Sequence, residues 1–265
     1  MNKLILIDAY ALIYRSYYAL IRSPRINSKG LNTSAVMGFV NTLWEVIQKE
    51  KPTHVAVAFD HGRTFRHDAY PPYKAQREET PEDIKLSVPI IKQILEAWHI
   101  PCLQADGYEA DDVIGAIAKS APCDIVYMLT PDKDYAQLVG DNVYMYKPRH
   151  GGGYDILGEP EICEKYTISS AKNVIDILAL MGDSADNFPG CPGVGEKTAI
   201  KLIKEFGDCE NIIANANNIK GALGKKVQEH IEDIRISRFL AEIKTDIPGI
   251  SQCRRDAQPD DAAAP

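Results

Sequence analysis

The sequence predicts an α/β fold in which a mostly parallel central sheet is flanked by helices and followed by a smaller, all-helical module. Three apolar runs, Lys3–Ile7, Thr53–Phe59 and Asp124–Leu129, are typical of strands that are covered on both faces. Helical patterns lie between these runs, and such alternation indicates parallel strands joined by crossover helices. From about Glu159 onward the strand signal ends, which predicts the helical module.

The remaining elements follow in chain order from the same patterns. Weaker strands are expected at Pro101–Gln104 and Asn142–Tyr146. The expected helices are Ala9–Leu20, Thr33–Glu50, Pro81–Trp98 and Glu109–Ser120, and then Pro160–Lys165, Ala171–Met181, Glu196–Phe206 and Lys225–Ile243. We therefore expect a sheet domain over 1–158, a helical module over 159–247 and, because periodicity is lost, a disordered tail over 248–265.

The composition excludes several classes of protein. Of the 265 residues, 45% are hydrophobic and 25% are charged, so we expect a sizeable core rather than a disordered chain. No apolar run approaches the ~18–20 residues of a membrane span, and Met1–Ile7 is too short for a secretory signal. The six cysteines form no C-x-x-C pair, which argues against disulfides and a cysteine zinc site. We therefore expect a cytoplasmic protein without membrane contact.

Aspartates follow the three strongest strand runs. Asp8 and Asp60 end two of them, and Asp132 comes just beyond the third. Because parallel strands carry their sites at their carboxyl ends, these three side chains should converge. An aspartate after a strand often caps the next helix, and for Asp8 alone this explanation is as good as a shared site. For the three aspartates together, a shared site is favoured over capping.

Further acids are spaced so that they repel one another unless a cation neutralises them. Glu109, Asp111 and Asp112 fall in the first turn of an expected helix, where the helix dipole also favours acids. Glu109 and Asp112 share one face of that helix. The remaining three acids are Asp134, Asp183 and Asp186.

The nine carboxylates indicate a site for hard cations. Oxygen ligands without a histidine or cysteine cluster suit Mg²⁺ or Mn²⁺ better than zinc. They are too many for one octahedral ion, so we expect two ions ~4 Å apart, the usual arrangement for hydrolysing a phosphodiester. Setting these nine aside leaves 28 of the 37 acids against 30 Lys and Arg, so the net charge of −7 does not exclude a nucleic-acid partner.

A basic and aromatic segment follows Asp60. Its cations and rings are Arg63, Arg66, Lys74, Arg77, Phe65, Tyr70 and Tyr73. Interleaved cations and aromatic rings beside a metal site indicate contacts with phosphates and stacking on bases. A solvated loop is the alternative, and the position directly after a site aspartate favours the contacts.

A glycine-rich turn lies in the helical module within about 187–206. The segment Gly190–Ala199 (GCPGVGEKTA) opens a helix, and its Gly193 and Gly195 allow positive φ and a close approach to the backbone. Backbone amides at a helix start can bind a DNA phosphate, and Lys197 adds positive charge. The pattern is that of a helix-hairpin-helix, and it does not fit a Walker motif. The candidate contacts are Gly190, Gly193, Gly195, Lys197 and Thr198.

Taken together, these motifs resemble one family. LILIDAYALIYRSYYA, AVAFD, YKAQR, GYEADDVIG, TPDKDYAQL and LMGDSADNFPGCPGVGEKTA are similar to the 5′–3′ exonuclease (flap endonuclease-like) domain of bacterial-type DNA polymerase I. The resemblance runs from the N-terminus to about Ile247. It implies a PIN-like or resolvase-like sheet, and a metal-dependent nuclease that removes primers or flaps at 5′ ends of DNA in replication and repair.

The resemblance also implies roles for single residues. One metal ion would be bound by Asp8, Asp60, Glu109 and Asp111, and the other by Asp112, Asp132, Asp134, Asp183 and Asp186. Lys74 and Arg77 match a basic pair, at the base of a helical arch over about 63–98, that contacts the scissile phosphate. Tyr73 matches a stacking aromatic residue. The hairpin would hold duplex DNA with a bound monovalent cation such as K⁺.

Some alternatives stay open from the sequence. After Pro248 the chain departs from the family and ends in a polar tail, so a free-standing nuclease and a truncated polymerase both fit. A PIN-like ribonuclease or a non-catalytic DNA-binding module are the rival functions. A phosphatase with Asp8 as nucleophile would need an aspartate where Tyr10 stands. We expect a monomer that binds DNA and that works beside a DNA polymerase.

Overall fold

A six-stranded sheet forms the centre of the computed structural model, which describes residues 1–250. In the order β3-β2-β1-β4-β5-β6, the strands are Cys102–Leu103, His54–Ala58, Lys3–Asp8, Ile125–Leu129, Val143–Pro148 and Tyr154–Leu157. All neighbouring pairs are parallel except β5 and β6, which are antiparallel. The predicted mostly parallel sheet is therefore confirmed. Strand β6 was not predicted; it is a four-residue edge strand without a fully buried side chain.

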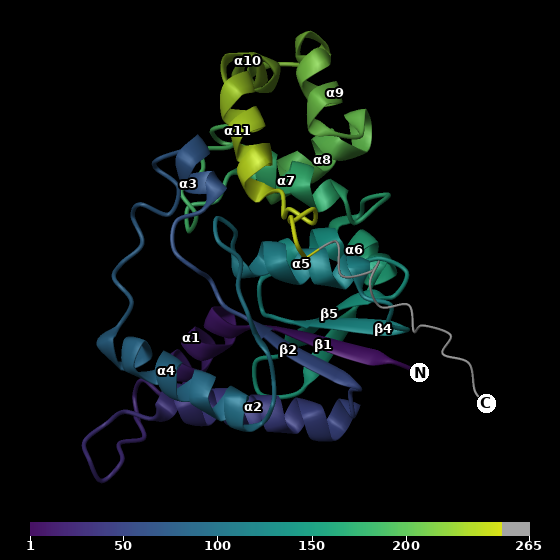
Figure 1. Cartoon of the computed structure of the whole chain (residues 1–265). Coiled ribbons are helices and arrows are strands. Elements are labelled where there is room, and N and C mark those ends of the chain that lie inside the picture. Colours follow the sequence, from purple (N-terminus) through teal and green to yellow (C-terminus); the bar gives the residue numbers. More distant parts are fainter. Residues whose placement is uncertain (251–265) are drawn as a thin grey trace, which may run out of the picture.

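Helices cover both faces of the sheet (Figure 1). On one face lie α1 (Ala9–Ala19), α2 (Ser34–Glu50) and α4 (Glu82–Ala97), and on the other lie α5 (Ala110–Ser120) and α6 (Glu159–Tyr166). The alternation of side chains along β1 divides the core accordingly: Ile5 and Ile7 pack into one cluster, and Leu4 and Leu6 into the other. Burial on both faces explains why this strand is apolar throughout.

The C-terminal module is all helical, as predicted. Its helices are α7 (Asn173–Met181), α8 (Glu196–Phe206), α9 (Cys209–Ala214), α10 (Ala222–Glu229) and α11 (Ile231–Ala241). The prediction of one helix over Lys225–Ile243 is wrong, because the chain breaks at His230, whose imidazole Nδ1 lies 2.7 Å from Asp233 Oδ2. The module shares one hydrophobic cluster with the α5 face of the sheet. It is therefore packed against the sheet domain.

A strap connects the two regions on one side of the molecule. We use this name for residues 70–81, which run from α3 (Phe65–Ala69), beside α11, to the start of α4 (Figure 1). The strap consists of turns followed by extended chain, so the predicted arch over about 63–98 is helical mainly in α4. Residues 248–250 of the predicted tail are ordered in a turn, in which the amide of Ile250 donates to the carbonyl of Ile247 at 3.2 Å, and the rest of the tail, from 251 onward, lies outside the described residues. No helix within 1–250 is long and apolar enough to cross a membrane.

Candidate active site

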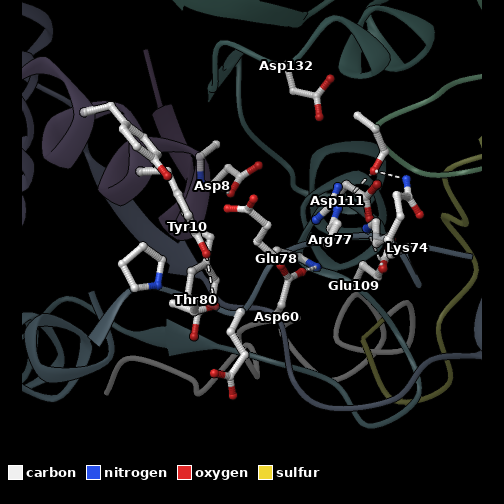
Figure 2. Close-up of a pocket in the computed structure, with 18 of the residues that line it drawn as sticks. Asp8, Tyr10, Asp60, Lys74, Arg77, Glu78, Thr80, Glu109, Asp111 and Asp132 are labelled. Atoms are coloured by element: carbon white, nitrogen blue, oxygen red, sulfur yellow. Dashed lines mark hydrogen bonds and ion pairs between the residues drawn. The ribbon is translucent and has the colours of Figure 1, made fainter. Parts of the chain in front are cut away.

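A cavity of about 870 Å³ opens at the carboxyl ends of β1, β2 and β4, with the strap along one side. Five of the nine predicted metal ligands line it: Asp8, Asp60, Glu109, Asp111 and Asp132. Lys74 and Arg77 line it as well. Figure 2 shows Asp8 and Asp132 on separate sides of the cavity, and Lys74, Arg77 and Glu109 grouped together. The sheet edge thus brings together acids from distant segments, as the strand-end argument predicted.

Backbone contacts fix the carboxylates at the cavity. Asp8 ends β1 and caps α1, because its Oδ1 accepts a hydrogen bond from the amide of Ala11 at 3.0 Å. Its Oδ2 accepts from the hydroxyl of Tyr135 at 3.1 Å. Asp60 Oδ1 accepts from the amide of Ala110 at 2.8 Å. Capping and lining the cavity are therefore compatible roles for Asp8.

The electrostatics of these acids favour a bound cation. Burial, and then the charge of Asp60, raise the pKa of Asp8 from its ordinary 3.8 to about 7. Burial likewise raises the pKa of Asp60 and raises that of Asp111 well above its usual range. Carboxylates whose ionised forms are disfavoured in this way are stabilised by a divalent cation, so this donor set fits hard metal ions.

A second group of acids lies beside the first. Asp134 Oδ1 is buried and has no hydrogen-bond partner among the described residues, and burial and the charge of Asp132 raise the pKa of Asp134 well above normal. Asp183 Oδ2 accepts from the ammonium group of Lys133 at 3.0 Å. Burial alone would raise the pKa of Asp183, but Lys133 and the amides of Ala185 and Asp186 together outweigh it and lower the pKa. The unpartnered oxygen of Asp134 is the clearest candidate for a ligand atom in this group.

Lysine and arginine side chains balance the acids in this arrangement. Lys74 Nζ lies 2.7 Å from Glu109 Oε1 and 3.9 Å from Asp186 Oδ2, and Arg77 pairs with Asp186 Oδ1. Burial would lower the pKa of Lys74, but the charges of Glu109 and Asp186 outweigh it and raise the pKa. In residues 1–250, no three His, Cys, Asp or Glu side chains converge closely enough to hold a metal as they stand.

Two predicted roles are corrected by one buried ion pair. Arg66 is 1% exposed and Asp112 is fully buried, and the guanidinium binds both carboxylate oxygens at 2.7 and 2.8 Å. The same oxygens accept from the amides of Glu109 and Lys244. Arg66 is therefore not available to DNA, and Asp112 has no free oxygen for a metal ion.

Tyr73 is also corrected. Its side chain is 3% exposed, so it does not stack on a base. Its hydroxyl donates to Glu109 Oε2 at 2.9 Å and lies 3.2 Å from Asp186 Oδ2. Tyr73 thus orients two predicted metal ligands from behind the cavity.

Three other tyrosines at the cavity were missed. Tyr10, Tyr14 and Tyr18 line it from α1, with ring centroids 6.4 and 6.2 Å apart along the series. Their spacing of four residues directly after Asp8 puts them on one helix face. That spacing was the sequence signal that could have identified them.

The glycine hairpin is formed, with one correction. Gly190 is buried, and a Cβ there would lie 2.2 Å from the backbone nitrogen of Gly182, so it serves packing rather than DNA contact. Gly193 uses the positive φ that glycine allows, at +79, whereas Gly195 is extended at φ −99 and caps α8. A Cβ at Gly193 would lie 2.7 Å from Nζ of Lys226, a cation that the sequence reading missed because it is distant along the chain.

On the surface of this hairpin, Lys197 is exposed and Thr198 is half-buried. A Cβ at Gly195 would meet open space. These three residues remain accessible to a ligand that approaches the start of α8.

Two family models match the chain. Residues 3–167 match the 5′-3′ exonuclease, N-terminal resolvase-like domain, and residues 169–261 match the 5′-3′ exonuclease, C-terminal SAM fold. DNA polymerase I of Bacillus subtilis (strain 168) is 42% identical over 256 residues, which cover 93% of this chain and 28% of the relative. A 5′-3′ exonuclease of Aquifex aeolicus (strain VF5) is 37% identical over 250 residues, which cover 93% of this chain and 83% of the relative.

Solved structures of low identity share the fold. A T5 5′-exonuclease structure with divalent metal ions (zinc) has a TM-score of 0.76 at 22% identity, and covers 92% of this chain and 90% of its own. The catalytic core of Rad2 in complex with DNA substrate has a TM-score of 0.61 at 19% identity, with 92% and 80% covered. The chain spans 25–28% of the length of several DNA polymerase I relatives. Because the two models together span nearly the whole chain, and the sheet and helical module have the expected resolvase-like and SAM-like forms, the chain belongs to the 5′-3′ exonuclease family.

Proposed function

We propose that this chain is a metal-dependent 5′ nuclease that hydrolyses DNA phosphodiesters at 5′ ends and flaps, in replication and repair. The observation that carries the proposal is the cavity at the sheet edge, where acids from four segments face Lys74 and Arg77. Acids there can hold cations, and cations there can bind phosphate. The family membership gives the same class of reaction.

Two groups of carboxylates are the proposed metal ligands. Asp8, Asp60, Glu109 and Asp111 form one, and Asp132, Asp134, Asp183 and Asp186 form the other. Two divalent cations, Mg²⁺ or Mn²⁺, would activate the attacking water and neutralise charge on the phosphate when bound. The metal ions named for the T5 structure support this use of divalent cations.

The chain's own residues position the phosphate. Lys74 and Arg77 donate to its non-bridging oxygens, and they stabilise the negative charge that increases in the transition state. A P–O bond forms to water and the P–O3′ bond breaks, which leaves a 5′-phosphate and a 3′-hydroxyl. The rings of Tyr10, Tyr14 and Tyr18 offer stacking surfaces to the bases beside the cavity.

The glycine hairpin is the proposed contact with duplex DNA. Amides at the start of α8, with Gly193, Gly195, Lys197 and Thr198, would bind backbone phosphates without regard to sequence. Lys226 adds a cation to the same turn. The resemblance to the family further suggests a K⁺ ion at this turn. The DNA complexes named for the T5 and Rad2 structures support a DNA substrate.

The test is cleavage of a 5′-flap DNA duplex by the full chain with Mg²⁺, with Mn²⁺ and with excess chelator. We expect cleavage that needs the metal and that yields 5′-phosphate ends. An RNA flap in the same duplex tests the ribonuclease alternative, and binding without cleavage would support the DNA-binding module. Cleavage that persists unchanged in chelator rejects the metal mechanism.

The assembly is part of the same proposal. We infer that the chain acts as a monomer, because one chain supplies both the cavity and the hairpin. A DNA polymerase is the proposed partner, since several of the relatives that carry this segment are DNA polymerase I proteins. Analytical ultracentrifugation with and without flap DNA tests the monomer, and a one-to-one complex is the expected result.

A further inference from the structure

Arg66 of α3 is a buried cation that contacts two separate parts of the chain, α5 and the end of α11. Its guanidinium binds the carboxylate of Asp112 on α5 with two hydrogen bonds of 2.7 and 2.8 Å. It also donates to the carbonyl oxygens of Leu240 at 2.9 Å and Glu242 at 2.8 Å. All four hydrogen bonds are made by one side chain that is 1% exposed.

These contacts tie the helical module to the sheet domain. Leu240 and Glu242 lie at the end of α11, where carbonyl groups lack helical partners and the helix dipole favours a cation. The amide of Lys244 donates to Asp112 Oδ1 at 2.7 Å, on the same carboxylate. The chain that leaves α11 is therefore held to α5 through the Arg66–Asp112 pair.

The same pair supports Glu109 from behind. Asp112 Oδ2 accepts from the amide of Glu109 at 3.0 Å, and Arg66 Nη1 lies 3.4 Å from Glu109 Oε2. The other oxygen of Glu109, Oε1, faces Lys74 at the cavity. The guanidinium of Arg66 thus contacts both the end of α11 and the carboxylate of Glu109 at the cavity, so it links the helical module directly to the cavity.

We propose that Arg66 is a positioning residue that sets the distance between the duplex-binding hairpin and the carboxylate cavity. The proposal rests on the nuclease function proposed above. Duplex DNA held at the hairpin would then present its phosphate at the cavity in a fixed register. Loss of Arg66 should leave each part able to bind, but should uncouple binding at the hairpin from cleavage.

Only the planar fork of arginine fits this place. A lysine retains the positive charge, but it cannot make two parallel bonds to a carboxylate while it also donates to two carbonyl groups. Arg66→Lys therefore keeps Asp112 paired and loosens the tie. The matched control is Arg235→Lys, on exposed α11 surface, where arginine pairs with Glu210 and Glu232 away from the cavity.

The first measurement needs no activity. Hydrogen exchange in the full chain should show at least about tenfold faster exchange of the amides over 240–247 in Arg66→Lys, because this segment loses the guanidinium that holds the carbonyl groups of Leu240 and Glu242. The amides of α8 should exchange as in the parent, and Arg235→Lys should change neither. Unchanged exchange over 240–247 would overturn the tie, even in a protein that cleaves nothing.

The second measurement tests the coupling. Two 5′-flap substrates are compared, one with a duplex long enough to reach the hairpin and one too short to do so. The parent and Arg235→Lys should cleave the long duplex faster, and in Arg66→Lys this preference should fall at least fivefold, with duplex affinity in chelator within twofold of the parent. A preference that is retained overturns the proposal. If no variant and no parent cleaves, the nuclease function fails, and the exchange result stands separately.

A milder variant covers the case in which Arg66→Lys does not fold. Phe239 on α11 is 36% exposed and packs edge-on against Phe65 of α3, with ring centroids 5.7 Å apart. Phe239→Ala loosens the same junction without disturbing a buried charge. It should reduce the preference for the long duplex about twofold. Full retention of the preference in this variant would also reject the positioning role.

Discussion

The side-chain nitrogen of Lys74 lies 2.7 Å from Oε1 of Glu109, so the proposed phosphate-binding cation is paired with a proposed metal ligand. The two side chains are only 18% and 8% exposed. Lys74 also has a left-handed backbone, at φ +55, and its amide donates to the carbonyl of Asp186 at 2.9 Å. If Glu109 binds a metal ion as proposed, its carboxylate would no longer need the ammonium group, and Lys74 would be available to the scissile phosphate.

Replacing Lys74 by alanine should therefore affect the rate much more than DNA binding. The contact is strongest in the transition state, so its loss should slow single-turnover cleavage of a 5′-flap duplex about a hundred- to a thousandfold. Affinity in chelator should fall only modestly, because one phosphate contact among several is lost. The control is Lys85→Ala on α4, whose cation pairs with exposed Glu79 and Glu82. A Lys74→Ala rate within threefold of the parent contradicts the assignment.

Asp183→Asn should slow cleavage without weakening DNA binding, unlike the loss of a cation. Asp183 pairs with Lys133 at 3.0 Å, so the change removes a negative charge and frees an ammonium group beside the cavity. Cleavage should slow at least about a hundredfold, because a proposed metal ligand is lost. In chelator the variant should bind DNA as tightly as the parent or more tightly. The control is Asp233→Asn on α11. The assignment is wrong if a folded Asp183→Asn protein cleaves at the parental rate, or if it binds DNA much more weakly than the parent.

The pKa of Asp8 predicts how stability depends on pH in chelator. The folded pKa is about 7 and the ordinary value is 3.8, so between these values the folded protein retains a proton that the unfolded chain has lost. The free energy of unfolding should therefore fall as the pH rises through this window, by at most about 4 kcal/mol. Asn is also a good helix cap and is never charged.

Asp8→Asn should thus gain stability relative to the parent as the pH rises. Urea unfolding in chelator at pH 4 and pH 8 measures this difference, and saturating Mg²⁺ should remove the advantage of asparagine. The control is Asp68→Asn, at an exposed carboxylate that pairs with Arg63. An advantage of Asp8→Asn that is equal at both pH values would show that its charge is not destabilising.

Much of the fold was predictable because it depends on burial. Strands β1, β2 and β4 are covered on both faces, so each leaves a continuous apolar run in the sequence. Strand β6 is a short edge strand and leaves no such run. The break at His230 was missed because the apolar spacing of α10 continues into α11, and a single backbone turn leaves no periodic signal.

The site was predictable only in part. Asp8 and Asp60 were predictable because parallel strand topology alone brings them to the same edge of the sheet, independently of the contacts of their side chains. Asp111 and Asp112 show what the sequence pattern does not resolve. Neighbours on a helix point about 100° apart, so Asp111 lines the cavity while Asp112 is buried in the core. The sequence shows that position 66 is an arginine in a basic segment, but the partners of Arg66 lie far away along the chain, with Asp112 46 residues and Leu240 174 residues distant. Such long-range pairing has no local signature.

Two neighbouring lysines of α10, Lys225 and Lys226, differ in their ion pairs. The ammonium group of Lys226 lies over the turn at Gly193, and it has no ion-pair partner within residues 1–250. Lys225 instead pairs with Glu229 at 3.6 Å and is 79% exposed. An ammonium group with no carboxylate partner, beside a turn that exposes backbone amides, should bind a phosphate of the duplex and release a counterion.

Lys226→Ala should therefore weaken duplex binding about three- to tenfold for every sequence, and should reduce the slope of log affinity against log salt by about 0.9. The measurement is duplex affinity in chelator at four salt concentrations, so that cleavage does not interfere. Lys225→Ala is the matched control, since its charge is already balanced by Glu229, and it should change affinity less than twofold. Equal losses for the two variants would mean that Lys226 contributes only general positive charge, and an unchanged salt slope for Lys226→Ala would remove it from the DNA contact.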